Sequence, residues 1–294
     1  MHRSGFAALI GRPNVGKSTL LNALAGEKIA IVTDKPQTTR NRIRAVLTRD
    51  EAQVIFIDTP GLHKPKHKLG TAMVQAARAT MREVDVICFV VEAQRAPGPG
   101  DRHIAALFDK GAAPVFLVLN KIDLIGQQEI EKQLSLYREL FDFDACFPVS
   151  ALARSKLDAL VEAVIARLPE GPRYYPPEMI TDQPERFIAA EIIREKMINA
   201  TRDEIPFSIA VVVEEMRPRE GKEIIDIRAV IYVERPSQAG IVIGKGGFLL
   251  KEAGSAARAE LELLLGQQVY LDLWVKVKRD WRNREGSLQE FGYS

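Results

Sequence analysis

Short apolar runs in the first half of the chain alternate with segments whose apolar residues recur every three to four positions. The runs cover 5–10, 54–57, 86–91, 115–119 and 145–149. Because they do not alternate with polar residues, they are typical of parallel strands covered on both faces. The intervening segments predict helices at 19–25, 71–82, 101–110, 128–141 and 156–167. This order predicts a doubly wound α/β domain whose ligands lie at the carboxyl ends of its strands.

The second half has a different periodicity. We expect a helix at 187–197, strands at 208–214 and 223–234 with a turn at 218–221, two further helices and a last strand at 269–277. Apolar residues alternate with polar or aromatic ones in the last strand, so one face should be buried. The order predicts a two-layer α+β domain. The helix before the last strand should bury Leu250, Ala253, Ala257, Leu261 and Leu264.

A proline-rich stretch at 168–177 separates the two halves and ends the preceding helix. We therefore assign residues 1–172 to the first domain, 173–185 to a linker, and 186–294 to the second domain with a basic tail. The proline density predicts a semi-rigid linker.

Composition excludes few classes of protein. The net charge is only +2, so any surface for nucleic acid must be local. Cys88 and Cys146 lie in apolar runs and are interpreted as core residues in a reducing compartment. There is no charged-then-apolar leader and no apolar stretch of bilayer length, so we expect neither a signal peptide nor a transmembrane helix.

The loop after the first apolar run, 11–18, fits the phosphate-binding pattern G-x-x-x-x-G-K-[ST]. Glycines let backbone N–H groups curl around a phosphate, and the following helix adds the positive end of its dipole. Lys17 would bridge the β- and γ-phosphates, and Ser18 would place a hydroxyl on Mg²⁺. A glycine-rich turn without a ligand is the plain alternative. The strand before the loop and the helix after it favour the phosphate site.

Asp58-Thr59-Pro60-Gly61 closes the second apolar run. The aspartate can hold Mg²⁺ through water, and the N–H of Gly61 can reach the γ-phosphate. The same tetrapeptide is also an ordinary turn, and its place at a strand end favours the site.

Asn120-Lys121-Ile122-Asp123 closes another run and indicates the base. A buried Asp123 carboxylate can accept from N1–H and the 2-amino group of guanine, donors that adenine lacks. The Lys121 stem can lie over the base, and a backbone N–H at Ser150-Ala151 would meet guanine O6.

The polar segment 33–41 lies between these motifs and looks like a mobile loop. A threonine here could complete the Mg²⁺ shell when a γ-phosphate is present. Thr39 is preferred over Thr38, and a plain solvated loop remains an alternative. The run 63–68, His-Lys-Pro-Lys-His-Lys, is interpreted as a solvated or partner-facing basic loop, because its lysines disfavour a metal.

Gly244-Lys245-Gly246-Gly247 lies between two predicted helices. In that place a G-x-x-G turn fits the loop of a KH domain, which approaches single-stranded nucleic acid, although a tight helix–helix turn is the plain alternative. The tail interleaves cations with indoles, which suits phosphate neutralisation and base stacking, or simply a solvated basic end. Its residues are Trp274, Lys276, Lys278, Arg279, Trp281, Arg282 and Arg284.

The motifs occur in the order and approximate spacing of translation-factor-type GTPases. The nearest group resembles the one that contains the bacterial GTPase Era, on the sequences GRPNVGKSTLLNAL and PQTTR. The resemblance covers essentially the whole chain and implies a P-loop GTPase domain followed by a type II KH domain. In that family an apolar residue stands where Ras-like proteins carry the glutamine that orients the attacking water, and Leu62 occupies this position here. The asparagine matching Asn14 can coordinate K⁺ at the phosphates.

The resemblance implies the roles of individual residues. Lys17, Thr39 and Gly61 would serve catalysis, and Ser18, Thr39 and Asp58 would hold Mg²⁺. The implied GTP contacts are Gly11, Arg12, Pro13, Asn14, Val15, Gly16, Lys17, Ser18, Thr19, Asp58, Thr59, Pro60, Gly61, Leu62, Asn120, Lys121, Ile122, Asp123, Ser150 and Ala151. The implied RNA contacts are Ile243, Gly244, Lys245, Gly246, Gly247, Trp274, Lys276, Lys278 and Arg279.

The resemblance also implies slow GTP hydrolysis coupled to binding of the 3′ end of 16S rRNA during maturation of the small (30S) ribosomal subunit. It implies a cytoplasmic monomer that is peripheral at the inner membrane, although no residue of this sequence indicates a membrane. Two other functions stay open. A GTPase that serves an RNA-modifying enzyme would need a catalytic cysteine or an additional domain, and a nucleotide-gated RNA chaperone would hydrolyse GTP only incidentally.

Overall fold

The computed structural model describes residues 2–109 and 111–293, which form two compact units. The first unit runs to Ala30 and also contains Thr39–Lys66 and Gly70–Asp182. The second contains Ile31–Thr38, His67–Leu69 and the chain from Gln183 onward. Two short segments from the first half of the sequence therefore belong to the second unit.

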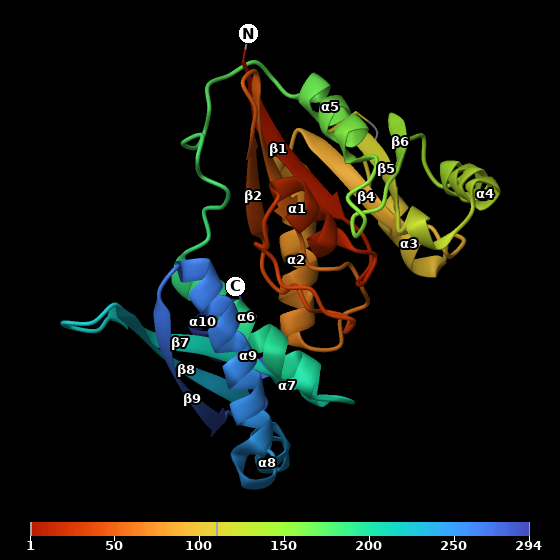
Figure 1. Cartoon of the computed structure of the whole chain (residues 1–294). Coiled ribbons are helices and arrows are strands. Elements are labelled where there is room, and N and C mark those ends of the chain that lie inside the picture. The colour runs from red at the N-terminus through yellow and green to blue at the C-terminus, as the bar shows by residue number, and fades with distance from the viewer. Residues whose placement is uncertain (1, 110, 294) are drawn as a thin grey trace. The chain divides into compact units, whose positions relative to one another are not determined.

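A six-stranded sheet forms the centre of the first unit (Figure 1). Its strands are β1 (Arg3–Ile10), β2 (Ile43–Thr48), β3 (Ala52–Asp58), β4 (Val86–Glu92), β5 (Val115–Asn120) and β6 (Ala145–Pro148). They lie in the order β2-β3-β1-β4-β5-β6, with β2 antiparallel to β3 and the other neighbours parallel. The loops that follow β1, β3, β5 and β6 therefore leave the same edge of the sheet.

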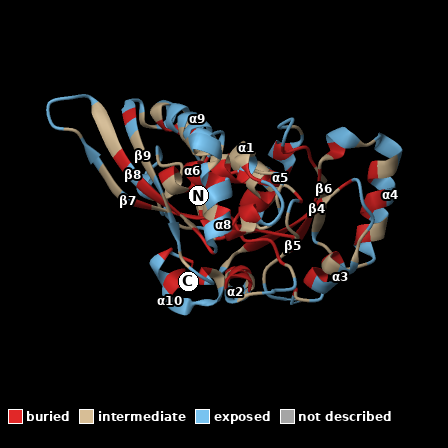
Figure 2. Ribbon diagram, turned by 90° about the horizontal axis from the view of Figure 1, so that it is seen from below, coloured by how far each residue is buried: buried red, intermediate tan, exposed pale blue. Residues whose placement is uncertain are grey.

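Helices cover both faces of this sheet. α1 (Lys17–Ala25) and α5 (Leu157–Arg167) contact β1 and β3 on one face. On the other face, α2 (Lys68–Glu83), α3 (Pro99–Ala105) and α4 (Gln127–Arg138) share a core with β1, β4 and β5. Figure 2 shows β4 and β5 almost wholly buried, as the unbroken apolar runs predict.

The α/β prediction is confirmed, but strand β2 was missed. Its sequence, IRAVLT, mixes polar with apolar residues because it is an antiparallel edge strand, so no apolar run marks it. α3 ends at Ala105, earlier than predicted, and the predicted end at Lys110 lies outside the described residues. α4 ends at Arg138 instead of 141.

Residues 173–182, expected to belong to a linker, are hydrogen-bonded along the first unit. The Val46 amide donates to the Ile180 carbonyl at 2.8 Å. The Gln53 side chain accepts from the amide of Tyr175 and donates to its carbonyl, both at 2.9 Å. The first bond satisfies a donor on the outer edge of β2, which would otherwise be unpaired. The bonds from Gln53 tie the segment to the neighbouring strand β3.

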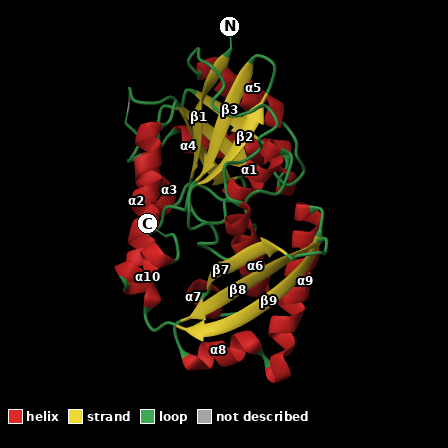
Figure 3. Ribbon diagram, turned by 90° about the vertical axis from the view of Figure 1, so that its left-hand side faces the viewer, coloured by secondary structure: helices red, strands yellow, loops and turns green. Residues whose placement is uncertain are grey.

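A three-stranded sheet packed against helices forms the second unit (Figure 3). β8 (Ile224–Val233) pairs antiparallel with β7 (Ala210–Pro218) and parallel with β9 (Gln268–Val277). α6 (Glu185–Ala200) and α9 (Phe248–Leu265) share its core, and α8 (Pro236–Ile243) precedes the G-x-x-G turn. The two-layer α+β prediction is confirmed.

Several short elements were not predicted. They are η1 (Ile122–Leu124), α7 (Ile205–Ser208), η2 (Lys245–Gly247), η3 (Trp281–Asn283) and α10 (Glu285–Glu290). In α9 the predicted inward position of Leu264 is wrong, because 42% of that residue is exposed near the end of the helix. Within the described part of the chain, every helix is too short or too polar to cross a membrane.

Candidate nucleotide and RNA sites

The loop from Gly11 to Ser18 joins β1 to α1 and has a tight backbone. Gly16 lies at φ 95°, and a Cβ there would come within 2.3 Å of the Asn120 side-chain nitrogen. Asn14 also has a positive φ, of 64°. α1 begins directly after Gly16, and among the described residues no side chain caps its first amides. Uncapped amides at a helix N-terminus form a ready anion site.

Lys17 is buried, and its burial lowers the pKa of the ammonium to about 8, an effect that the nearby Asp58 carboxylate opposes. Nζ donates to the carbonyl oxygens of Arg12 at 2.9 Å and Gly11 at 3.4 Å. A phosphate beside Nζ would raise this pKa, because an opposite charge favours the charged form. Nucleotide binding should therefore fully protonate the Lys17 amine.

This geometry predicts proton uptake on nucleotide binding. With a free pKa of about 8, Lys17 is half charged at pH 8, so binding there should take up about 0.5 proton. Affinity should be constant below this pKa and fall as the pH rises through it. Calorimetric titration in two buffers of different ionisation enthalpy measures the uptake. If the uptake does not rise between pH 7 and pH 8.5, Lys17 is already charged in the free protein or does not face the phosphates.

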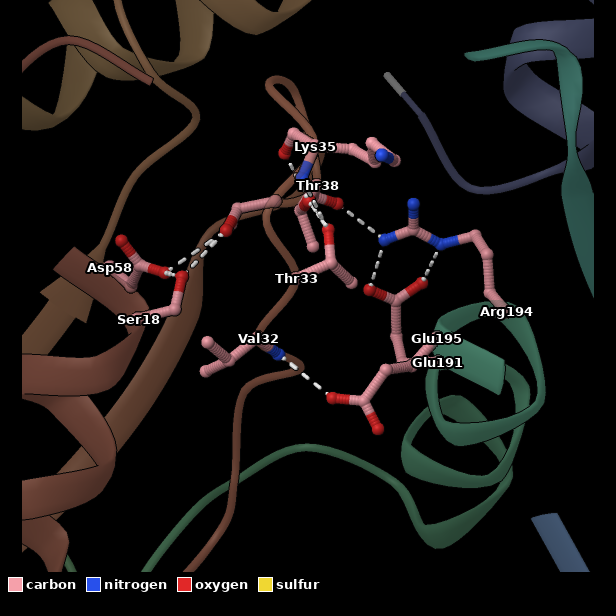
Figure 4. A network of polar contacts seen from close by, with 10 residues as sticks. Ser18, Val32, Thr33, Lys35, Thr38, Asp58, Glu191, Arg194 and Glu195 are labelled. Carbon is pink, nitrogen blue, oxygen red and sulfur yellow. Dashed lines mark hydrogen bonds and ion pairs between the residues drawn. The ribbon is translucent and has the colours of Figure 1, made fainter. Parts of the chain in front are cut away.

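Three oxygen-bearing side chains converge beside this loop, from α1, from the segment before β2 and from the end of β3. Ser18 Oγ lies 2.8 Å from Thr39 Oγ1 and donates to Asp58 Oδ2 at 2.5 Å (Figure 4). Asp58 is fully buried, and its Oδ1 has no hydrogen-bond partner among the described residues. An unpartnered buried carboxylate oxygen beside two hydroxyls is a donor set that Mg²⁺ takes. These residues therefore fit a magnesium site.

Burial raises the pKa of the Asp58 carboxyl, opposed by the Lys17 ammonium and by hydrogen bonds from Ser18 and Thr39. A divalent cation at Oδ1 would favour the ionised form, since a bound metal is the largest local charge in such a site.

The structure distinguishes the two threonines that the sequence analysis left as alternatives. Thr38 Oγ1 donates to the Lys35 carbonyl at 2.7 Å and lies 2.6 Å from Thr33 Oγ1, so this hydroxyl is used inside its own loop. Thr39 Oγ1 instead donates to Asp58 at 3.2 Å. The geometry favours Thr39 as the magnesium ligand.

The loops after β5 and β6 form the expected base site. Asn120 is buried, donates to the Val15 carbonyl at 3.0 Å, and accepts from the Ala151 amide at 3.0 Å. It therefore ties the phosphate loop to the base loop. Ser150 Oγ donates to Asp123 Oδ1 at 2.5 Å and orients that carboxylate. Asp123 is exposed, whereas the sequence predicted a buried carboxylate.

Some predicted contact residues can reach a ligand only through their backbone. The side chains of Val15, Leu62 and Ile122 are buried. Lys121 differs, because its Nζ donates to the Asn14 carbonyl at 2.9 Å and its stem therefore crosses the space between the two loops.

Asp58-Thr59-Pro60-Gly61 brings a second loop against the phosphate loop. A Cβ on Gly61 would come within 2.6 Å of the Pro13 nitrogen, so only glycine fits this approach. The Leu62 amide donates to the Gly11 carbonyl at 3.0 Å. The side chain of Leu62 has no polar group with which to align water.

Arg12, the arginine of the phosphate loop, is held by α3. Its Nε donates to Asp101 Oδ1 at 2.8 Å. Asp101 is fully buried and also accepts from the Gly98 amide at 2.9 Å, which caps α3. This guanidinium is therefore directed at a structural carboxylate instead of a transition state.

The G-x-x-G turn in the second unit is open to solvent. Gly246 and Gly247 have φ values of 60° and 78°. A Cβ on Gly246 would meet no described atom within 4 Å, so a ligand can approach this backbone closely. Ile243 and Lys245, on either side of Gly244, are exposed.

Comparisons with known proteins match both units. The family described as 50S ribosome-binding GTPase matches residues 6–121, and the KH domain family matches residues 204–282. A variant of Aquifex aeolicus Era, solved with GDP and AlF4⁻, is 43% identical over 99% of both chains, with a TM-score of 0.96. An Era solved with MgGDPNP and nucleotides 1506–1542 of 16S ribosomal RNA is 44% identical over 100% of both, with a TM-score of 0.95. This chain belongs to the Era family of GTPases.

This Era-family chain has a groove beside the G-x-x-G turn that the sequence analysis missed. It lies between α9 and β9 and has a volume of about 280 Å³. Its lining residues are Gly247, Leu250, Lys251, Gly254, Ser255, Arg258, Leu271 and Leu273. Lys251 and Arg258 add cations that the resemblance did not indicate. Their spacing from Gly247 is helical, which is the signal that could have revealed them.

Trp274 and Lys276 lie on the opposite face of the sheet from this groove. Leu271 and Leu273 line the groove, and alternate residues of a strand point the other way. Trp274 is 58% exposed and donates to Asp272 at 3.0 Å. The RNA contacts expected for an Era-family chain therefore fall into two sets, of which only the G-x-x-G set adjoins the groove.

The expected stacking of Trp281 on a base is wrong. Trp281 is fully buried, donates from its indole to the Ser208 carbonyl at 2.9 Å, and packs against Phe291 and Tyr293. The tail folds back because these aromatic residues supply a small apolar cluster of their own.

Several cations of the tail also form ion pairs within this Era-family chain. Lys278 pairs with Glu290, and Arg282 pairs with Glu234. Arg279 is exposed. Lys276 pairs with Glu214 at 3.3 Å. Of the four RNA contacts expected from Trp274 onward, Lys276 and Lys278 are thus already engaged in ion pairs within the chain.

Proposed function

We infer that this Era-family chain is a GTP-binding and GTP-hydrolysing switch that binds 16S rRNA near its 3′ end and acts in small (30S) subunit assembly. Full-length similarity to an Era bound to both MgGDPNP and nucleotides 1506–1542 of 16S ribosomal RNA carries this assignment. The GTPase family description mentions the 50S subunit, whereas 16S rRNA belongs to the small subunit, so we assign the small one.

Each residue of the GTP site has its own role in this proposal. Bound Mg²⁺ supplies positive charge between the β- and γ-phosphates. Ser18, Thr39 and Asp58 would hold it, and Lys17 would neutralise phosphate charge within the loop. Asp123, oriented by Ser150, selects guanine. Lys251 and Arg258, with the G-x-x-G turn, neutralise the backbone of a single strand.

Crosslinking of the full chain to RNA, followed by sequencing of the bound fragment, tests the RNA assignment. The recovered fragment should come from the 3′ end of 16S rRNA. Fragments drawn from 23S rRNA or spread evenly over all RNA would overturn it.

We propose that hydrolysis depends on charge supplied from outside the protein, with K⁺ beside Asn14 as one source. Leu62 cannot align water and Arg12 is held by Asp101. Asn14 is exposed in the phosphate loop and carries an amide oxygen, a hard donor suited to an alkali cation. The bound RNA or the ribosomal particle is the second source.

Turnover in Na⁺ alone should be well below about 1 s⁻¹, the range that assisted GTPases exceed. K⁺ should accelerate it at least about tenfold, because placing one charge at a transition state has effects of that order or larger. Asn14→Ala should remove the acceleration without changing GTP affinity in Na⁺. Phosphate-release assays in matched Na⁺ and K⁺ buffers measure this, and fast hydrolysis in Na⁺ without RNA would reveal a catalytic group elsewhere.

We also propose a cytoplasmic monomer with peripheral association at the inner face of the cell membrane. Family resemblance alone supports this placement. Cell fractionation with and without a high-salt wash tests it, since a peripheral protein should leave the membrane fraction on washing.

A further inference from the structure

One segment of the chain connects Thr39 to the KH unit. Residues Ile31–Thr38 lie between α1 and β2 in the sequence but belong to the second unit. Thr39 belongs to the first unit, where its hydroxyl lies 2.8 Å from Ser18. The chain therefore passes from one unit to the other at the peptide bond directly before the magnesium ligand.

Helix α6 holds this segment through a buried network of polar contacts (Figure 4). Arg194 is fully buried and donates from Nη2 to the Thr38 carbonyl at 2.5 Å. Its Nε and Nη2 also donate to the Glu191 carboxylate at 2.7 and 2.6 Å. The next residue of the helix, Glu195, accepts from the Val32 amide at 2.9 Å. Both ends of the segment are thus bound to the same helix.

A buried ion pair is a poor means of stabilising a core, because desolvation of the two charges offsets their attraction. The Arg194 pKa is nevertheless raised: burial lowers it, and the charge and hydrogen bonds of Glu191 more than compensate. Arg194 is therefore charged, and its planar fork reaches a carboxylate and a main-chain carbonyl together. A lysine ammonium, as a point charge, does not reproduce that geometry.

We propose that Arg194 is a positioning residue for the GTP site: by holding the Thr38 carbonyl, it keeps Thr39 within reach of Ser18 and Asp58. This proposal rests on the proposed role of Thr39 as a magnesium ligand. A threonine of this kind ligates the metal only when the γ-phosphate is present, so the contact favours GTP over GDP. By linkage, bound GTP favours the arrangement of α6 that makes the contact.

A second short segment from the first half of the sequence is also bound to the second unit, but through weaker contacts. His67–Leu69 also belongs to the second unit, where the Lys68 amide donates to Asn283 Oδ1 at 3.3 Å. Lys68 Nζ pairs with Glu285 at 2.6 Å. Both side chains of that pair are exposed, and exposed pairs contribute little, so α6 is the element to test.

Arg194→Lys keeps a positive charge opposite Glu191 and removes the fork that reaches Thr38. In the full chain with Mg²⁺, it should weaken binding of a non-hydrolysable GTP analogue about tenfold and change GDP affinity less than about twofold. Arg186→Lys, at an exposed arginine of the same helix, is the matched control and should change neither. Equal affinities for the analogue in the Arg194→Lys variant and the wild type would overturn the proposal.

A double-mutant cycle separates positioning from general stability. Thr39→Ala alone should lose the preference for the GTP analogue, and no loss would refute the role of Thr39. In that background Arg194→Lys should have no further effect, because it acts through Thr39. An equal loss in both backgrounds would overturn the positioning role. If Arg194→Lys does not fold, the double variant Arg194→Met, Glu191→Leu removes both charges and is measured in the same cycle.

Discussion

Replacing Asp123 with asparagine is expected to weaken GTP binding about 100-fold or more and to create affinity for XTP. The Asp123 carboxylate, oriented by Ser150 Oγ at 2.5 Å, can accept two hydrogen bonds from guanine. An asparagine turns one acceptor into a donor, which suits the second carbonyl of xanthine. Each lost bond to a charged group costs about 1.5–3 kcal/mol. Equilibrium titration of the full chain with GTP and XTP measures both changes.

XTP binding serves as the control for folding in this experiment. The Asp123→Asn variant should bind XTP about as tightly as the wild type binds GTP, which shows that its phosphate loop is intact. Lys17→Ala should lose affinity for both nucleotides. If Asp123→Asn binds GTP normally, Asp123 does not read the base.

Gly246→Asp is expected to abolish detectable RNA binding, a loss of about 100-fold or more. It places a carboxylate where the backbone would approach the phosphates of a single strand. The fold should be unharmed, because a Cβ at Gly246 meets no described atom within 4 Å and aspartate tolerates the left-handed φ of 60°. Gel-shift titration with a fragment of the 16S 3′ end measures the loss.

Gly246→Asn is the matched control. Asparagine has the same shape and the same tolerance of positive φ without the charge. It should keep most of the RNA affinity, within about fivefold of the wild type. Equal losses in both variants would assign the effect to shape, and normal binding by Gly246→Asp would refute the assignment of this turn to RNA.

The GTP site was largely predictable from the sequence because its chemistry lies at strand ends. Apolar runs locate the ends of β1, β3 and β5, and the residues after them must meet at one edge of a parallel sheet. The motifs that follow these strand ends then identify Ser18, Asp58 and Asn120. The sequence favoured Thr39 over Thr38 without excluding Thr38. The hydrogen bonds support that choice, because they show that the Thr38 hydroxyl is used inside its own loop.

Features that depend on long-range packing were not predictable. Strand β2 is an edge strand that mixes polar with apolar residues, so no continuous apolar run marks it. Trp281 looks like a stacking residue in a basic tail. Its hydrogen-bond partner Ser208 is far away in the sequence, and no pattern in the sequence indicates that Phe291 packs against it. Likewise, nothing in segment 31–38 indicates that α6 holds it, because the hydrogen bonds from Arg194 and to Glu195 involve main-chain atoms of Thr38 and Val32.

Binding of a 16S 3′-end RNA by the full chain in two nucleotide states is the sharpest test of the assigned function. With Mg²⁺ and a non-hydrolysable GTP analogue, affinity should exceed that with GDP by about tenfold, a coupling typical of a switch. An unrelated single strand of equal length should bind at least about tenfold more weakly in both states. Equal affinity with the analogue and GDP, or for both RNAs, would contradict a GTP-dependent switch acting on the 3′ end of 16S rRNA.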